Sequence, residues 1–283
     1  EKLEKEWNTY PVLHFDLSKG KHMEKEQLNR YLLDIIEKQE ARFDSKSNKI
    51  DVNIRLDDLI NAVYQKTGKQ VVVLIDEYDA PLLDVMNDKV RLPSLRQIMR
   101  NFYSPIKSLD PYLRFVFITG INKFAQLSIF SELNNLKNIS METKYSAICG
   151  ISQKELEDNI QYGVQALADR QKISYDEALK LLKYNYDGYH FCYKSTGMYN
   201  PFSLLNTFAK RQIGSYWFET GTPTYLVELM KLHHYNVEEI EHIVTSGPVL
   251  DSIDAASTDP VPVIYQSGYL TIKDYNAEFE NYT

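Results

Sequence analysis

Apolar residues follow two different patterns along the first half of the chain. Three short segments are apolar at successive positions, near residues 12–17, 71–76 and 114–119. Two stretches between them, 24–43 and 56–64, repeat apolar residues every three to four positions. Continuous apolar runs are typical of strands buried on both faces, and the three-to-four spacing is typical of amphipathic helices. We therefore expect a parallel sheet with helices on both sides and with 71–76 as its middle strand.

A third amphipathic helix is expected after the middle strand, and the pattern changes near residue 150. Apolar residues at helical spacing run from Leu95 to Ile106, with Pro93 near their start. Ser152 precedes Glu155 by three positions, which is the capping box that begins a helix. The spacing then predicts further helices at about 153–168, 174–185, 201–211 and 222–232.

Short strands are expected before and after these helices. The segment 145–152 is apolar enough to form one further short strand. The segment 261–276 has the residue pattern of a β-hairpin centred near Ser267 and Gly268. Helices followed by a terminal hairpin indicate a winged-helix-like module at the end of the chain.

Composition excludes some classes of protein. The 283 residues are 43% hydrophobic and 25% charged, which is ordinary for a soluble globular protein. No apolar run approaches the roughly 20 residues that span a bilayer, so we expect no membrane partner. The net charge of −7 argues against broad electrostatic binding of nucleic acid, although a local basic face would still allow it. Cys149 and Cys192 lack metal-ligand or redox spacing, which favours a reducing, cytoplasmic location.

The middle strand ends in a cluster of carboxylates. Asp76 and Glu77 follow the apolar run directly, and Asp79 comes two residues later. Parallel sheets bind their ligands at the carboxyl ends of the strands, where Thr119 and Asp16 would also lie. These residues are either the edge of a functional site or the point where a buried strand reaches water.

An apolar strand that ends in Asp-Glu matches the Walker B element of P-loop ATPases. Asp76 would hold Mg²⁺ through its water shell, because Mg²⁺ prefers oxygen ligands and keeps several waters. Glu77 would orient and polarise a water for attack on a γ-phosphate. Thr119 or Asn122, near the tip of the neighbouring strand, could hydrogen-bond that water or the phosphate. Asp79 is interpreted as a cap or turn residue just beyond the site.

The sequence lacks the loop that would bind the phosphates. No G-x-x-x-x-G-K-[ST] motif occurs, and the pairs Gly20-Lys21 and Gly68-Lys69 lack the upstream glycine and the following Ser or Thr. The chain also begins without Met. We therefore expect either a piece of a longer protein whose P-loop precedes Glu1, or a chain that does not hydrolyse ATP.

Five motifs resemble those of one known family. In chain order they are VVVLIDEYDAPL, FVFITGINKFAQLSIFSELNNLKNIS, YSAICGISQKEL, YDGYHF and YNPFSLLN. Together they resemble the predicted AAA-ATPase-like family of bacterial proteins, which is related to archaeal and STAND-type ATPases. The resemblance covers nearly the whole chain. It implies a P-loop before the first strand and, in many members, a C-terminal nuclease-like domain of the PD-(D/E)XK class.

The resemblance also implies a fold. Residues 1–150 would form an α/β, parallel-sheet core of the P-loop NTPase type, AAA/ASCE, that lacks its Walker A segment. Residues 151–283 would form a helical lid and a winged-helix-like region. The missing P-loop strand would lie between the sensor strand and the last strand of the sheet.

Site residues follow from the same resemblance, position by position. Asp76 and Glu77 fall on the Walker B element, with Asp76 as the metal ligand. Thr119 falls near the sensor 1 position. Asn122 and Lys123 lie beside it as further candidates, Asn122 for catalysis and Lys123 for binding of the nucleotide.

Two classes of function are expected. The first is an ATP-binding, ATP-hydrolysing domain that acts as a nucleotide-driven switch, with ATP and Mg²⁺ as cofactors of the parent protein and weak or absent binding in this piece. The second is a non-catalytic module that binds protein or DNA through residues 150–283. Metal-dependent nuclease chemistry in the piece itself would need an acid-x-Lys strand, which IDEYD lacks.

Self-association would let a basic residue act across a subunit interface as an arginine finger. A solvated helix face is the default interpretation of the basic residues in and around the third helix, which are Arg91, Arg96, Arg100, Lys107 and Arg114. In YDGYHF, Asp187 or His190 could lie near the nucleotide, but a turn among core aromatic residues is favoured. Asn200 is expected to cap a helix that begins at Pro201.

Overall fold

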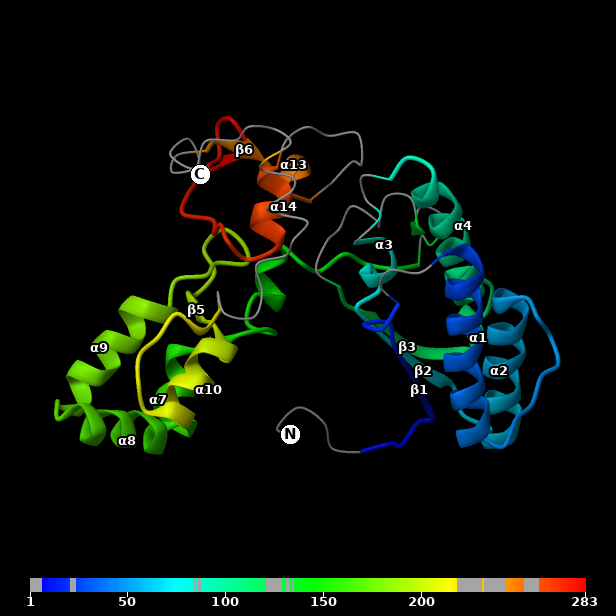
Figure 1. The fold of residues 1–283 in the computed structure, drawn as a ribbon, viewed down its shortest axis with the longest axis horizontal. Helices are drawn as coiled ribbons and strands as arrows, with labels where there is room; N and C mark the ends of the chain where they lie inside the picture. The colour runs from blue at the N-terminus through cyan, green and yellow to red at the C-terminus, as the bar shows by residue number, and fades with distance from the viewer. Residues whose placement is uncertain are drawn as a thin grey trace. The chain divides into compact units, whose positions relative to one another are not determined.

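The chain folds into two compact units in the computed structural model (Figure 1). The described residues up to Lys137 form the first unit, and those from Asn138 onward form the second. The predicted domain boundary at residue 150 stays a prediction. The structure describes residues 7–20, 24–83, 85, 88–120, 129–130, 133, 135–217, 231, 243–251 and 260–283.

A three-stranded parallel sheet forms the centre of the first unit. Its strands, in sheet order, are β1 (Val12–Asp16), β2 (Val71–Asp76) and β3 (Leu113–Ile118). Asp16 pairs with Asp76 and Ile75 pairs with Ile118, so the three carboxyl ends lie at one edge. The prediction of a parallel sheet with 71–76 as its middle strand is therefore confirmed.

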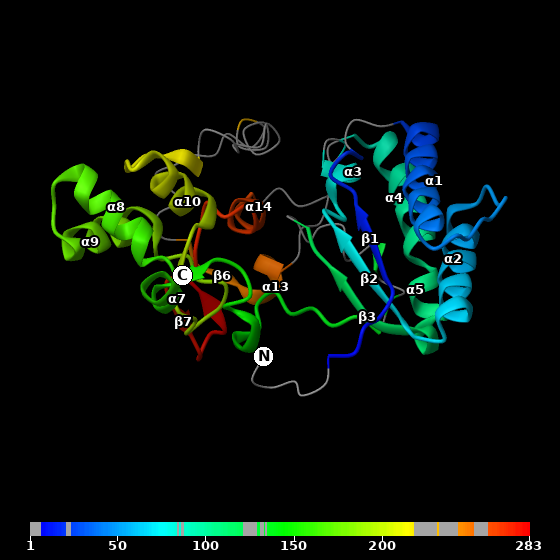
Figure 2. The ribbon, with the colours of Figure 1, turned by 90° about the horizontal axis from the view of Figure 1, so that it is seen from below.

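Helices lie along one side of this sheet, as α1, α2 and α4 show in Figures 1 and 2. Gly68 ends α2 in the left-handed conformation, with φ of 64°, as the sequence predicted. Arg42 is the last residue of α1, and Pro93 lies in the first turn of α4. The helices whose bounds the structure describes in this unit are α1 (Lys25–Arg42), α2 (Val52–Thr67), α3 (Ala80–Leu83), α4 (Arg91–Tyr103), α5 (Pro105–Ser108) and the 3₁₀ helix η1 (Asp110–Tyr112).

The two faces of the sheet differ in burial. Phe15 and Val73 are buried, whereas Leu74 is half-buried and Phe115 is 54% exposed. Side chains alternate between the faces of a strand, so the less buried residues share the face away from the helices. The expected second layer of helices is not found among the described residues of this unit. Apolar residues on both faces indicate only that both faces can be covered.

A buried ion pair joins α1 to α2. The side chain of Arg55 donates from Nε and Nη2 to the two carboxylate oxygens of Glu40, at 2.9 and 2.7 Å. Glu40 is 2% exposed, and the pair raises the pKa of the Arg55 guanidinium through hydrogen bonds to Glu40. The bidentate geometry satisfies both charged groups where water is excluded.

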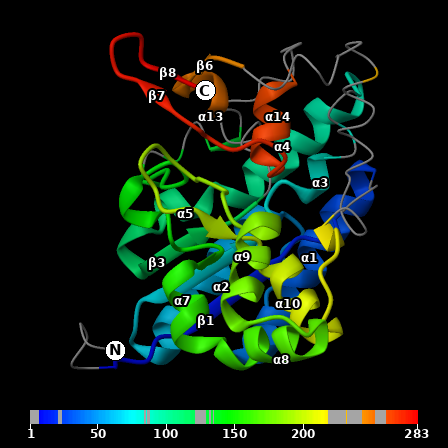
Figure 3. The ribbon, with the colours of Figure 1, turned by 90° about the vertical axis from the view of Figure 1, so that its left-hand side faces the viewer.

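The second unit contains two groups of elements (Figures 1 and 3). Helices α7 to α10 form one group, with the two-residue strands β4 and β5 beside it. Helices α13 and α14 form the other, with a small antiparallel sheet of order β6-β8-β7. The bounds are η2 (Thr143–Tyr145), β4 (Ile151–Ser152), α7 (Gln153–Asn159), α8 (Gln161–Gln171), α9 (Tyr175–Tyr186), β5 (Met198–Tyr199), α10 (Pro201–Lys210), β6 (Thr245–Ser246), α13 (Gly247–Asp251), α14 (Val261–Gln266), β7 (Tyr275–Asn276) and β8 (Asn281–Tyr282).

Helix caps predicted from the sequence are confirmed in this unit. The Ser152 side chain accepts from the backbone N–H of Glu155, and the Glu155 carboxylate accepts from the backbone N–H of Ser152. The Asn200 side chain accepts from the Ser203 N–H at 2.9 Å, and α10 begins at Pro201. These bonds satisfy N–H groups that a first helical turn leaves free.

Three predicted elements of this unit differ from the structure. The helix predicted at 153–168 is broken at Ile160, whose φ of −122° leaves the helical range, so α7 and α8 are separate. The strand predicted at 145–152 is reduced to the two residues of β4. The hairpin predicted at 261–276 begins instead with the helix α14, because a short apolar run does not distinguish a strand from a buried helix.

Two further predictions concern this unit, the helix at 222–232 and the winged-helix-like module. The helix predicted at 222–232 lies outside the described residues, except for Lys231. The winged-helix-like module stays a prediction. Within the part of the chain that the structure describes, no helix has both the length and the apolar character to cross a membrane.

Candidate functional site

Three carboxylates and a hydroxyl meet at the carboxyl edge of the parallel sheet. Asp16 ends β1, Asp76 ends β2 with Glu77 directly after it, and Thr119 follows β3. The Thr119 hydroxyl donates a short hydrogen bond to Asp76 Oδ1, and the Glu77 backbone N–H donates to the same oxygen at 3.0 Å. The structure therefore brings together the three predicted site residues that it describes.

Backbone bonds continue the strand pairing into this edge. The Thr119 N–H donates to the Ile75 carbonyl at 2.9 Å, and the Tyr78 N–H donates to the Thr119 carbonyl at 3.0 Å. On the other side, the Leu17 N–H donates to the Asp76 carbonyl at 3.0 Å. Residues 76–78 are thus held between the continuations of both neighbouring strands.

Glu77 has an unusual backbone conformation. Its φ is 50°, which is the left-handed region that residues other than glycine seldom adopt. Such strain costs on the order of 1–3 kcal/mol and persists only where neighbouring contacts hold it. The contacts here are the bonds of Thr119 to Asp76 and Tyr78, the two residues that flank Glu77. Glu77 is half-buried, so solvent still reaches it.

The carboxylates influence their neighbours electrostatically. Hydrogen bonds from Ser18 lower the pKa of Asp16, so this carboxyl stays ionised below the usual range. The Tyr31 hydroxyl donates to the Asp16 carbonyl at 2.8 Å. Burial raises the pKa of Tyr31, and the negative charges of Asp16 and Glu77 raise it further. The edge is therefore anionic and attracts a cation.

The donor set fits a magnesium ion that is carried by a bound nucleotide. Mg²⁺ commonly takes one or two carboxylates and completes its shell with waters and phosphate oxygens. Asp76 is exposed, and both hydrogen bonds described above end on its Oδ1, which leaves Oδ2 outside those two bonds. Among the described residues, no group of three or more His, Cys, Asp and Glu side chains is arranged to hold a metal ion by itself. A metal here would therefore need ligands from its substrate.

Asp79 lies in the turn directly before α3, where the sequence-based interpretation expected a cap or turn residue. Its full burial was not predicted from the sequence. The acid faces Gly120, which directly follows Thr119. The sequence signal that was missed is the pairing of Tyr78-Asp79 with a glycine at the end of the next strand. Asn122 and Lys123 lie outside the described residues.

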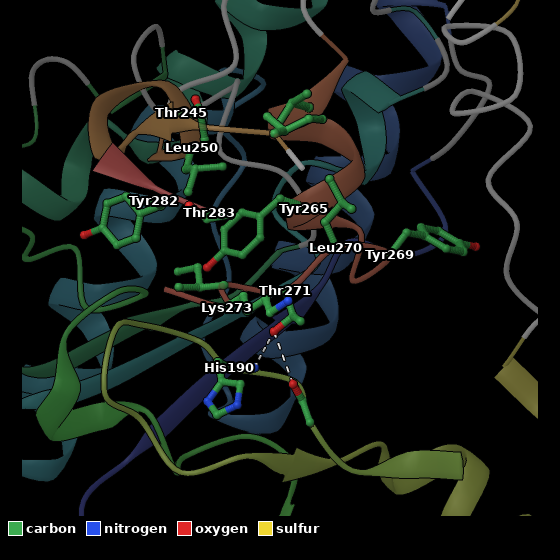
Figure 4. Close-up of a pocket in the computed structure, with 14 residues that line it drawn as sticks. His190, Thr245, Leu250, Tyr265, Tyr269, Leu270, Thr271, Lys273, Tyr282 and Thr283 are labelled. Atoms are coloured by element: carbon green, nitrogen blue, oxygen red, sulfur yellow. Dashed lines mark hydrogen bonds between the residues drawn. The ribbon is translucent and has the colours of Figure 1, made fainter. Parts of the chain in front are cut away.

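The second unit contains a separate cavity of about 450 Å³ (Figure 4). Apolar and aromatic side chains form most of its lining, among them Leu250 from α13 and Tyr265 from α14. The Thr271 hydroxyl accepts from the His190 backbone N–H at 2.6 Å and donates to the Gly188 carbonyl at 3.4 Å. The cavity was not predicted from the sequence, although residues 188 and 190 of the YDGYHF motif line it.

The fold and the site define an α/β protein whose parallel sheet is compatible with the core of a P-loop NTPase. Residues 1–130 match the family described as "Predicted AAA-ATPase". The resemblance found in the sequence is thereby confirmed.

A curated relative extends the similarity beyond this segment. The chain is 32% identical over 263 residues to a protein of Azotobacter chroococcum mcd 1 that is described as "Uncharacterized protein in vnfD 5'region". The match covers 93% of the chain and 49% of the relative, so the chain spans about half the length of that protein. No solved structure matches the chain.

Proposed function

We propose that this chain is part of an ATP-hydrolysing domain that acts as a nucleotide-driven switch. The chain would supply the residues that hold Mg²⁺ and orient the attacking water. The observation that carries the proposal is the bond from Thr119 to Asp76, which links the ends of β3 and β2 beside the strained Glu77. A strand end that only meets water would need neither this bond nor a left-handed glutamate. The family supports ATP and Mg²⁺ as the cofactors.

Each residue of the edge has a proposed role. A bound Mg²⁺ would neutralise charge that develops on the phosphates. Asp76 would hold this ion through its waters, and the Thr119 hydroxyl would keep the Asp76 carboxylate in place. Glu77 would orient a water and accept its proton, because a half-buried carboxylate next to a γ-phosphate can polarise the attacking oxygen. Asn122 and Lys123 remain proposed contacts of the nucleotide.

The phosphate-binding loop would come from outside this chain. The sequence has no P-loop motif, and the family resemblance implies a P-loop strand beside the sensor strand. Among the described strands, β3 pairs only with β2, so its other edge is free to receive such a strand. The exposed ring of Phe115, stacked at 6.0 Å on Phe117, marks the sheet face that added chain would cover.

Further partners are proposed from the sequence and from the length of the curated relative. A nuclease-like domain would account for part of the length by which the curated relative exceeds this chain. Self-association, nucleic-acid binding and a cytoplasmic location are proposed from the sequence. The alternative function, a non-catalytic interaction module, is favoured by the apolar cavity of the second unit, which holds none of the site carboxylates.

The proposal is tested by sequencing the reading frame and by assaying the natural full-length protein of the source organism. We expect its reading frame to contain G-x-x-x-x-G-K-[ST] within some tens of residues before the first strand, and we expect the purified protein to release phosphate from ATP only when Mg²⁺ is present. Absence of the motif, or presence of the motif without hydrolysis, would leave the interaction module as the better proposal.

A further inference from the structure

A buried aromatic and acidic cluster lies directly behind the candidate site. Tyr78 and Asp79 follow Glu77, and both are buried, as is Tyr103 of α4. The Tyr103 hydroxyl donates to the Tyr78 carbonyl at 3.3 Å. The ring of Phe130 lies 5.1 Å from that of Tyr78 and 5.0 Å from that of Tyr103. The cluster fixes the chain immediately after Glu77.

Gly120 approaches this cluster more closely than any other residue type could. A Cβ atom at Gly120 would lie 2.5 Å from Asp79 Oδ1 and 2.4 Å from Tyr78 Cδ1. Real Cβ atoms are essentially never this close to other atoms. The glycine thus allows the backbone after Thr119 to press against Tyr78 and Asp79, which brings the ends of β3 and β2 together.

The burial of Asp79 needs an explanation. Moving a carboxylate out of water is costly unless its oxygens are bonded or paired. Asp79 is fully buried and takes part in interactions within the protein. The pKa of the Tyr103 hydroxyl is raised well above its usual value. Burial is the largest cause, and electrostatic interactions with Tyr78 and Asp79 add to it. Asp79 lies one residue after Tyr78 and two after Glu77. Because burial of a carboxylate is costly, its position indicates a role at the site.

We propose that Asp79 is a positioning residue, which fixes Thr119-Gly120 against β2 so that Thr119 reaches Asp76 and Glu77 keeps its left-handed conformation. Asp79 would act through Thr119 and would not touch the substrate. This inference deepens the proposed function and rests on it for the hydrolysis measurement only. The positioning itself is a property of the 283-residue chain and can be measured without a nucleotide.

The first experiment measures hydrogen exchange of the Tyr78 amide, whose proton is bonded to the Thr119 carbonyl. Asp79→Leu removes both carboxylate oxygens at similar size, and Asp79→Asn keeps one acceptor. We expect Asp79→Leu to lower the protection of this amide by about tenfold or more, the scale of one lost buried hydrogen-bonding partner. Asp79→Asn should retain part of the protection. Unchanged protection in Asp79→Leu would overturn the proposal.

A matched control separates positioning from general loss of stability. Glu40 is the other buried acid among the described residues, and it is paired with Arg55. Glu40→Gln therefore alters a buried acid that lies far from Asp79 in the sequence. We expect it to lower the melting temperature without a selective loss of protection at Tyr78. If Asp79→Leu does not fold, Gly120→Ala replaces it, since the added methyl group must push the same loop away from Asp79.

Coupling to Thr119 makes the test specific. Thr119→Val removes the hydroxyl that bonds Asp76 but leaves Asp79 in place. If Asp79 acts through Thr119, the effects of Asp79→Leu and Thr119→Val on Tyr78 protection will not add, because neighbours in one network are coupled. Additive effects would overturn the proposed route through Thr119.

The second experiment uses ATP hydrolysis by the full-length protein. We expect Asp79→Leu to lower kcat by about tenfold or more and to raise the Mg²⁺ concentration needed for the half-maximal rate, because both Glu77 and the Thr119–Asp76 bond are displaced. Asp79→Asn should recover part of kcat. An equal loss of kcat in Glu40→Gln would overturn the proposal. A change confined to KM in Asp79→Leu would also overturn it. If the unaltered protein does not hydrolyse ATP, the proposed function fails, and the exchange data still decide the positioning role.

Discussion

Two adjacent acids at the end of β2 have different surroundings, although the sequence presents them as a pair. Asp76 is exposed and accepts hydrogen bonds from the Thr119 hydroxyl and the Glu77 N–H. Glu77 is half-buried and carries the backbone strain. The first acid is therefore accessible to a hydrated cation, and the backbone of the second takes one constrained conformation beside it.

Separate effects of these two acids are the prediction at the residue scale. In the full-length protein, Glu77→Gln should abolish single-turnover ATP hydrolysis but keep ATP bound, because an amide of the same shape cannot accept the proton of water. Asp76→Asn should mainly weaken Mg²⁺-dependent binding, because it removes charge but leaves an oxygen for Thr119. Rapid-mixing hydrolysis and nucleotide titration measure the two effects. Hydrolysis at the parent rate in Glu77→Gln would show that the assigned role is wrong.

At the scale of elements, the start of α4 depends on one ionised side chain. Asp88 Oδ1 accepts from the backbone N–H groups of Val90 and Arg91, each at 2.9 Å, and Oδ2 accepts from Arg91 Nε at 2.6 Å. These bonds lower the pKa of Asp88 from 3.8 to about 2. The lowered pKa means that folding favours the ionised carboxyl, so its contribution to stability is present above 3.8 and lost as the pH falls toward 2.

Stability against acid should therefore change in Asp88→Asn. The difference in melting temperature between parent and variant is expected to be largest above pH 4 and to shrink as the pH falls through the range from 3.8 to about 2. Asp158→Asn is the control, since Asp158 makes an exposed pair with Lys154 on a single helix. A difference that does not depend on pH would contradict the cap interpretation.

The pairing of α1 with α2 gives a second prediction at this scale. Arg55→Ala leaves the Glu40 carboxylate buried without its partner, so the free energy of unfolding should fall by about 3–5 kcal/mol. Lys38→Ala removes an exposed pair with Asp34 on the same helix and should change it by less than about 1 kcal/mol. Urea unfolding measures both variants. Equal effects would show that burial does not strengthen the Arg55–Glu40 pair.

The 283-residue chain contains the carboxylates of the proposed nucleotide site but no P-loop motif. The anionic edge of the sheet is present, but the sequence contains no P-loop to donate N–H groups and a lysine to the phosphates. Without those donors, the carboxylates of the edge attract the Mg²⁺ of the nucleotide but repel its phosphates. Under the proposed function, a P-loop strand would join the sheet at the edge of β3 that no described strand occupies.

We therefore expect the 283-residue chain to bind ATP weakly or not at all. Isothermal titration calorimetry with ATP and Mg²⁺ checks this, with the full-length protein as the matched comparison. Micromolar, Mg²⁺-dependent binding by the chain alone would contradict the prediction, because the phosphates would then have an anchor that the P-loop proposal does not include.

Local patterns in the sequence determined the strands at 12–16, 71–76 and 113–118, the cap residues Ser152 and Asn200, and the acids at the end of β2. Each of these depends on residues within about one helical turn or one strand, so a short window of sequence contains the necessary information. The broken helix at Ile160 and the helix α14 were missed, because apolar spacing in a short segment fits more than one structure.

Only the tertiary structure decided which of the acids are exposed and which is buried. Asp79 is buried where Gly120, which follows β3 and lies about forty positions later in the sequence, packs against it. Thr119 reaches Asp76 because β2 and β3 pair in parallel register, and Glu77 takes a positive φ because Thr119 holds the residues on either side. Hydrogen bonds and close packing between distant segments leave no periodic pattern in a single sequence, so the residue types at this edge were predictable while their geometry was not.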